Sequence, residues 1–194
     1  MNSSACPLWL ALAAVILLAG PLAIGADPAT EAIKIRKGIP NDWKAAIQKN
    51  AAERKAIAAA LMEVALDKKV KNDDRNEAIV LLVEIPSKDV IEFLLKHLTL
   101  EIPLYVEGGD ADRARRRPCR YALSKSDWFA VPQMLAFLKP KRTDEELNDL
   151  AYVLREAIGP PRAIALLTYE KQGAASPLRE NLEKVIARLK ADKG

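Results

Sequence analysis

Apolar residues recur at helical spacing in one segment of this chain after another. Within 51–66 they fall at positions i, i+4, i+7 and i+8 of one helix face: Ile57, Leu61, Val64 and Ala65. Similar stripes return in 147–158 and 178–189. Half of all residues are apolar but only 5% are aromatic, and the abundant Ala, Leu, Lys, Arg and Glu are good helix formers. The sequence therefore predicts an all-α fold.

Capping and breaking residues place the helix boundaries. Ser87 can cap a helix that follows Pro86, and Pro118 is tolerated in the first turn of another helix. Thr143 and Glu146 have the spacing of a capping box. The apolar run 75–85 also fits a buried strand by periodicity alone, but the helical segments on both sides favour a helix.

A second group of boundary signals concerns the loop and the later helices. Thr99 to Asp112 contains Gly108-Gly109 and no helical stripe, which predicts a long inserted loop. The helix that begins near Pro118 is expected to pair with a second helix over Trp128 to Leu138. Gly159-Pro160-Pro161 should end the helix that Thr143 opens, and Ser176-Pro177 should start the last one.

The N-terminal segment has the features of an export signal. An uninterrupted apolar stretch, Leu8 to Ala19, is followed by Gly20-Pro21 and by the small residues Ala23 and Gly25. We expect a signal peptide over 1–25, a linker over 26–40 and a helical domain over 41–194, in a secreted or periplasmic protein. Because no Lys or Arg precedes the stretch, the alternative is an uncleaved membrane anchor. After cleavage no membrane contact is expected.

Cysteine usage limits how the fold can be stabilised. The chain has two cysteines, and removal of the signal peptide would take Cys6 and leave Cys119 without a disulfide partner. Cys119 is expected to be a small buried hydrophobic residue, the alternative being a reactive thiol or an intermolecular bridge. The fold must then depend on helix packing.

Two parts of the chain resemble each other. DVIEFLLKHL from Asp89 aligns with AVPQMLAFL from Ala130, which places Val90 on Val131 at an offset of 41 residues. That interval falls in the range of about 40 to 47 residues that is typical of HEAT and armadillo repeats.

The run from Arg116 to Leu138 carries the family resemblance. It has Arg116 and Arg120 early in its first helix, Asp127 in a turn, and Ala130-Val131-Pro132 at the start of its second helix. In this arrangement it resembles a HEAT repeat. The resemblance implies a short α-solenoid, an α-α superhelix of stacked antiparallel helix pairs whose second helices line a concave surface. A non-repeating helical bundle is the alternative.

The sequence contains no recognised catalytic or metal-binding motif. His97 is the single histidine and lies on an apolar helix, where a packing or surface role is expected. HExxH, CxxC, GxGxxG and Walker patterns do not occur. Carboxylate pairs lie at predicted turns and helix starts, where the helix N-terminus favours them without catalysis. We therefore predict no cofactor, no metal and no enzymatic activity.

The densest chemical feature is a group of five arginines within eight residues. They are Arg113, Arg115, Arg116, Arg117 and Arg120, here called the arginine cluster. Guanidinium groups suit carboxylates and phosphates, but the cluster could instead be neutralised internally by Glu107, Asp110 and Asp112. As exposed charges, Arg115, Arg116 and Arg117 should together contribute less than about 1 kcal/mol to stability.

An aromatic pair is the second candidate contact. Trp128 and Phe129 are adjacent at the start of a predicted helix. They could bind a partner, although burial of at least one of them between repeats is expected.

These features predict a monomeric, non-enzymatic module that binds a protein or peptide. Anion or nucleic-acid binding through the arginine cluster is the alternative. A formal net charge of only +4 and the predicted export make nucleic acid an unexpected partner. An enzyme on a HEAT-like scaffold is the third possibility, for which the sequence offers no motif.

Overall fold

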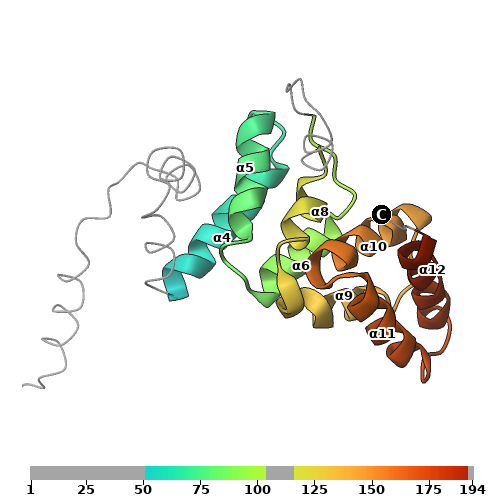
Figure 1. The fold of residues 1–194 in the computed structure, drawn as a ribbon. Coiled ribbons are helices and arrows are strands. Elements are labelled where there is room, and N and C mark those ends of the chain that lie inside the picture. Colours follow the sequence, from blue (N-terminus) through green and yellow to red (C-terminus); the bar gives the residue numbers. More distant parts are fainter. Residues whose placement is uncertain (1–50, 104–115, 192–194) are drawn as a thin grey trace, which may run out of the picture.

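The computed structural model describes residues 51–103 and 116–191, and every regular element in these two ranges is a helix (Figure 1). The predicted all-α class is confirmed. The expected signal peptide over 1–25, the linker over 26–40 and the first residues of the expected helical domain, 41–50, lie outside the described residues.

The first two described helices form a hairpin. Helices α4 (Ala51–Leu66) and α5 (Asn72–Leu82) pack against each other. Asp67 begins the turn between them, where its carboxylate accepts a hydrogen bond from the Lys69 amide at 2.8 Å. Arg75 of α5 reaches back and donates from Nε to the Ala65 carbonyl at 3.1 Å. The apolar run 75–85 is thus mostly helical, as the flanking helices indicated.

Helix α6 (Lys88–Lys96) begins where Pro86 and Ser87 predicted it. The Ser87 Oγ accepts a hydrogen bond from the Val90 amide at 3.2 Å, which satisfies one of the free N–H groups of the first turn. Its apolar stripe, Val90, Ile91, Leu94 and Leu95, is buried in the core, and so is Leu98, two residues beyond the end of the helix.

The remaining elements follow the undescribed range 104–115. They are α8 (Pro118–Leu123), the 3-10 helix η1 (Asp127–Ala130), α9 (Val131–Phe137), α10 (Asp144–Ile158), α11 (Pro160–Lys171) and α12 (Leu178–Ala191). The helix expected over Trp128 to Leu138 is therefore divided, because its first turn is a 3-10 helix with Asp127 in the left-handed region at a φ of 50°.

The capping box at the start of α10 is present. Thr143 Oγ1 accepts from the Glu146 amide at 3.2 Å, and the Glu146 carboxylate accepts from the Thr143 amide at 2.8 Å. At the other end Gly159 takes a φ of 81°, a conformation that a side chain would strain. This glycine lets α10 end and α11 begin at Pro160 with one residue between them.

Helix α8 lies at the centre of the packing. It contacts α5, α6 and α10, while α9 packs on α6. Stacked antiparallel pairs, as the HEAT resemblance implies, would place α5 on α6 and α8 on α9, and neither of these contacts is extensive. The extensive pairs are α4 with α5 and α11 with α12, because α5 and α6 both pack against α8 more than against each other (Figure 1).

Helices α10 and α12 pack side by side and run parallel. Lys184 pairs with Asp144 at 3.2 Å, and one turn further along both helices Arg188 donates to Asn148. Residues that advance together along two helices show a parallel alignment, here with an offset of 40 residues between partners. Helix α11 connects the two and packs against both.

One buried amide fixes the start of α12. Asn181 is 3% exposed, and its Nδ2 donates to the carbonyls of Leu138 at 2.8 Å and Pro140 at 2.7 Å. These carbonyls follow the end of α9, so the amide replaces the water that would otherwise bind them. It joins the last helix to the segment between α9 and α10.

We expect Asn181→Ala to lower the free energy of unfolding by about 2 kcal/mol, because two partly or fully buried carbonyls lose their donor. Urea denaturation followed by circular dichroism measures the change. Arg179→Ala, an exposed position on the same helix, is the control and should change stability by less than about 0.5 kcal/mol. Equal stability of the two variants would contradict the role of the amide.

Candidate binding surfaces

Three carboxylates surround the guanidinium of Arg117, the residue that precedes α8. Glu101 Oε1 accepts from Nε at 3.0 Å and from Nη2 at 2.7 Å, and Glu145 accepts from Nη2 at 2.6 Å. Asp149 accepts from Nη1 at 2.7 Å. Partial burial alone would lower the pKa of Arg117, but the hydrogen bonds and charges of Glu101 and Asp149 outweigh it and raise the pKa.

Asp149 connects this group to a second arginine. Its side chain is only 2% exposed, and its other oxygen accepts from Arg120 Nη1 at 2.9 Å. The positive charges of two guanidinium groups therefore compensate the negative charge of one buried carboxylate. These ion pairs join α8 to α10. The Arg120 guanidinium also lies 4.5 Å from the ring centre of Tyr152, a cation–π contact. Arg117, Arg120, Asp149, Glu101 and Glu145 are called the ion cluster below.

The ion cluster also holds together the two ends of the undescribed range. The Ile102 amide donates to the Arg116 carbonyl at 2.9 Å, next to the pair formed by Glu101 and Arg117. Residues 102 and 116 are thereby kept side by side. The described part of the predicted inserted loop, from Thr99 to Pro103, contains no helical residue.

The structure divides the predicted arginine cluster. Arg117 and Arg120 turn toward carboxylates of the protein itself, whereas the Arg116 side chain is exposed. Arg113 and Arg115 lie outside the described residues, together with Glu107, Asp110 and Asp112, the acids proposed to neutralise them. The partners of Arg117 come instead from Glu101 and α10. The expectation that Arg117 is an exposed charge with a small contribution to stability is therefore corrected, because its side chain is only 22% exposed.

We expect Arg117→Ala to destabilise the fold by about 2 kcal/mol or more, because the substitution takes one of two cations away from the buried carboxylate of Asp149. Arg116→Ala removes the neighbouring, exposed arginine and should stay within about 0.5 kcal/mol of the wild type. Both are measured by urea denaturation at the same ionic strength. If the two variants are equally stable, the ion cluster does not hold α8.

The aromatic pair is exposed. Trp128 and Phe129 on η1 are 49% and 51% exposed, while the next residue, Ala130, is fully buried. The expectation that at least one aromatic ring is buried is wrong, because the 3-10 turn directs the small alanine inward and leaves both rings at the surface. The turn itself packs against α9 and α10.

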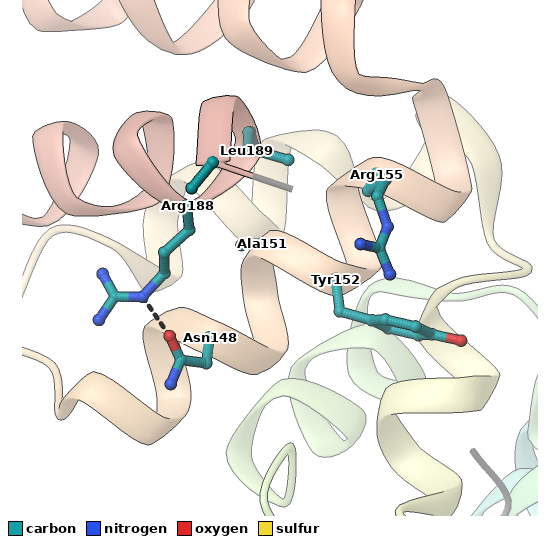
Figure 2. A pocket seen from close by; sticks show the side chains of 7 residues that line it. Asn148, Ala151, Tyr152, Arg155, Arg188 and Leu189 are labelled. Atoms are coloured by element: carbon teal, nitrogen blue, oxygen red, sulfur yellow. Dashed lines mark hydrogen bonds between the residues drawn. The ribbon is translucent and has the colours of Figure 1, made fainter. Parts of the chain in front are cut away.

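A third surface is a groove between α10 and α12, shown in Figure 2, with a volume of about 390 Å³. Its lining consists of Asn148, Ala151, Tyr152 and Arg155 from α10, and Arg188, Leu189 and Ala191 from α12. Sequence reasoning did not find this groove. Its two arginines stand in the last turns of their helices, an ordinary position for basic residues that gave no signal of a site.

No protein-family model, curated protein or solved structure that was compared with the chain matches it.

The other candidate groups are the single histidine, His97, and possible metal ligands. The His97 ring makes a tilted contact with Phe93 at a centroid distance of 4.8 Å, and burial followed by the charge of Lys96 lowers the pKa of His97. Within 51–103 and 116–191, no three His, Cys, Asp or Glu side chains are grouped so that they could hold a metal ion. In the same ranges no helix is long and apolar enough to cross a membrane.

Cys119 is fully buried, as its expected role as a small hydrophobic residue required. Burial raises the pKa of the Cys119 thiol to about 12, since the thiolate loses its hydration. At neutral pH the side chain is therefore a neutral thiol without access to solvent.

We expect the Cys119 thiol to resist iodoacetamide in the native protein at pH 8 and to react readily in 8 M urea, at about the rate of an exposed cysteine. Peptide mapping by mass spectrometry separates it from Cys6. Alkylation of Cys119 at comparable rates with and without urea would show that α8 opens often or that the thiol is accessible.

Proposed function

We propose that this protein is a non-enzymatic binding module for a protein or peptide, and that Trp128 and Phe129 form its main contact. The observation that carries the proposal is the half-exposure of two adjacent aromatic rings on a turn that is itself packed against α9 and α10. Aromatic residues that are exposed without a structural reason are typical of binding surfaces.

The local backbone supports this role. Asp127 takes the left-handed conformation at a φ of 50°, which is uncommon for a residue other than glycine. Together with the packing of η1 this fixes the direction of the two rings before a partner arrives. A preorganised contact loses less side-chain entropy on binding, and tryptophan is one of the residues that most often dominate binding energy.

The wider architecture remains part of the proposal: a short HEAT-like stack, secreted or periplasmic and monomeric. The order of contacts supports a stack, since α5, α8 and α10 follow one another through space as they do in the chain. So does the offset of 40 residues between partners on α10 and α12, which is close to the 41-residue interval between the aligned segments. These relations suit repeats that contact only their neighbours.

The arginine cluster is a weaker candidate for the contact. Arg117 and Arg120 are bound by Glu101, Glu145 and Asp149, so an external anion would have to compete with carboxylates already in place. We therefore keep the aromatic pair as the binding surface and do not propose nucleic acid as the partner.

Capture experiments with matched variants test the proposal. Wild-type protein, the double variant Trp128→Ala/Phe129→Ala, and Tyr169→Ala are immobilised and exposed to an extract of the native compartment. Tyr169 is 71% exposed and serves as the control for the loss of a surface aromatic ring. Mass spectrometry should identify proteins that bind the wild type and Tyr169→Ala but are depleted on the double variant.

The affinity of such a protein is then measured in purified form by calorimetry. We expect the double variant to bind about tenfold more weakly or worse, because truncation of a central aromatic contact commonly costs that much or more. Its circular dichroism spectrum and urea midpoint should match those of the wild type. If every captured protein binds the double variant with unchanged affinity, the aromatic pair is not the binding surface.

A further inference from the structure

The helix that follows the aromatic pair carries no charge. The run from Trp128 to Leu138 contains no Asp, Glu, Lys or Arg, although 29% of all residues in the chain are charged. Each of the other described helices contains at least one charged residue. A helix at the surface of a protein usually presents charged residues to the solvent, so α9 is the exception among the described helices.

The solvent side of this run forms one continuous surface. Phe129, Pro132, Gln133 and Ala136 have the spacing i, i+3, i+4 and i+7, and each is exposed or partly exposed, as is Trp128. These five residues are called the α9 strip below. In the described part of the chain α9 packs mainly against α6 and η1 (Figure 1). The aromatic pair is therefore one end of a longer uncharged surface.

The other end of the α9 strip enters a groove. Gln133 and Ala136 belong both to the strip and to the lining of this groove, which has a volume of about 350 Å³. The groove lies where α6, α9 and the start of α10 meet, and its full lining is Glu92, Leu95, Lys96, Gln133, Ala136, Phe137, Arg142 and Glu146. A ligand that lies along the strip would reach it.

The two acids of the groove are already bound within the protein. Glu92 pairs with Lys88 at 3.6 Å, and Glu146 pairs with Arg142 at 3.2 Å. The Glu146 carboxylate also accepts from the Thr143 amide at 2.8 Å, as part of the capping box. The charges of both acids are thus balanced by neighbouring cations.

Three lysines near the same groove have no such counterpart. Lys96 belongs to its lining, and Lys139 and Lys141 follow the end of α9. All three are exposed, and within the described residues none of them forms an ion pair. At the aromatic end of the strip the exposed charges of Lys125 and Asp127 are opposite. The strip therefore runs from an aromatic, electrically balanced end to a positive end.

We propose that the α9 strip binds a peptide segment of the partner in which apolar residues lie on the aromatic pair and an acidic residue lies at the lysines. Charge complementarity selects the acid. From Trp128 to Ala136 the helix advances about 12 Å, a distance that an extended peptide covers in about four residues. This inference rests on the function proposed above, because it specifies the partner of the same aromatic pair.

Synthetic hexapeptides test the charge of the partner on the full chain. Each is acetylated and amidated, begins with leucine and phenylalanine, continues with serine and glycine, and ends with two glutamates, two glutamines or two lysines. In nuclear magnetic resonance titrations we expect the glutamate peptide to bind about fivefold more tightly than the glutamine peptide, as two exposed ion pairs allow. The lysine peptide should bind most weakly. High salt should remove these differences.

A fourth peptide tests the apolar half of the segment. Two serines replace its leucine and phenylalanine, while the two glutamates remain. We expect this peptide to bind about tenfold more weakly than the glutamate peptide or worse, because it offers nothing to the two rings. Backbone amides of α9 should shift with the glutamate peptide.

Matched lysine variants locate the acidic end. The groove variant combines Lys96→Gln, Lys139→Gln and Lys141→Gln, and it should bind the glutamate and glutamine peptides equally. A control variant removes the same net charge by changing three exposed lysines outside the groove to glutamine: Lys68, Lys69 and Lys125. It should keep the preference of the wild type for glutamate.

Several results would overturn the inference. These are the absence of saturable binding of the glutamate peptide, equal affinity for the glutamate and lysine peptides, and a groove variant that keeps the preference for glutamate. The proposed function fails separately. If a captured protein needs the aromatic pair but binds the groove variant with unchanged affinity, the proposed function stands and the acidic partner is excluded. If peptides bind through the lysines and the double variant Trp128→Ala/Phe129→Ala has no effect, the aromatic pair is not the contact.

Discussion

The pairing of one buried carboxylate with two arginines is the interaction on which the arrangement of the helices depends most. Helix α8 has six residues, Pro118–Leu123, and a helix of that length is not stable without tertiary contacts. It nevertheless contacts α5, α6 and α10 and so connects the two halves of the described structure. Arg117 and Arg120 attach both ends of its first turn to Asp149. A carboxylate as buried as Asp149 is unfavourable without such partners, so α8 and α10 each need the other.

The parts of the fold that could be predicted from the sequence are those set by neighbours within about four residues. The Ser87 cap, the capping box of Thr143 and Glu146, and Pro118 in a first turn are interactions of this kind, and all are present. The ion cluster could not be found in the same way, because Asp149 lies 32 residues from Arg117 in the chain. The apolar pattern gave no signal of it either, because Asp149 lies on the side of α10 opposite the stripe that contains Leu150 and Leu154.

The contacts between helices and the exposure of the aromatic pair could not be predicted from the sequence for a related reason. Apolar spacing identifies the buried face of a helix but not the helix that covers it. The aligned residues Val90 and Val131 are both buried, yet α5 and α6 face α8 more than each other. At Trp128 the deciding factor is a single turn: a 3-10 helix places its side chains differently from an α-helix, and it directs Ala130 inward. Neither outcome follows from the apolar pattern alone.

The parallel alignment of α10 and α12 explains why two arginines line the same groove. Acidic residues occupy the first turn of each helix and basic residues the last, as the helix dipole favours. In parallel helices the carboxyl ends point the same way, so that Arg155 and Arg188 come to line one groove even though each suits its own helix. Tyr152 contacts both Arg155 and Arg120, so the ring that orients one side of the groove also lies against the ion cluster that holds α8 in place.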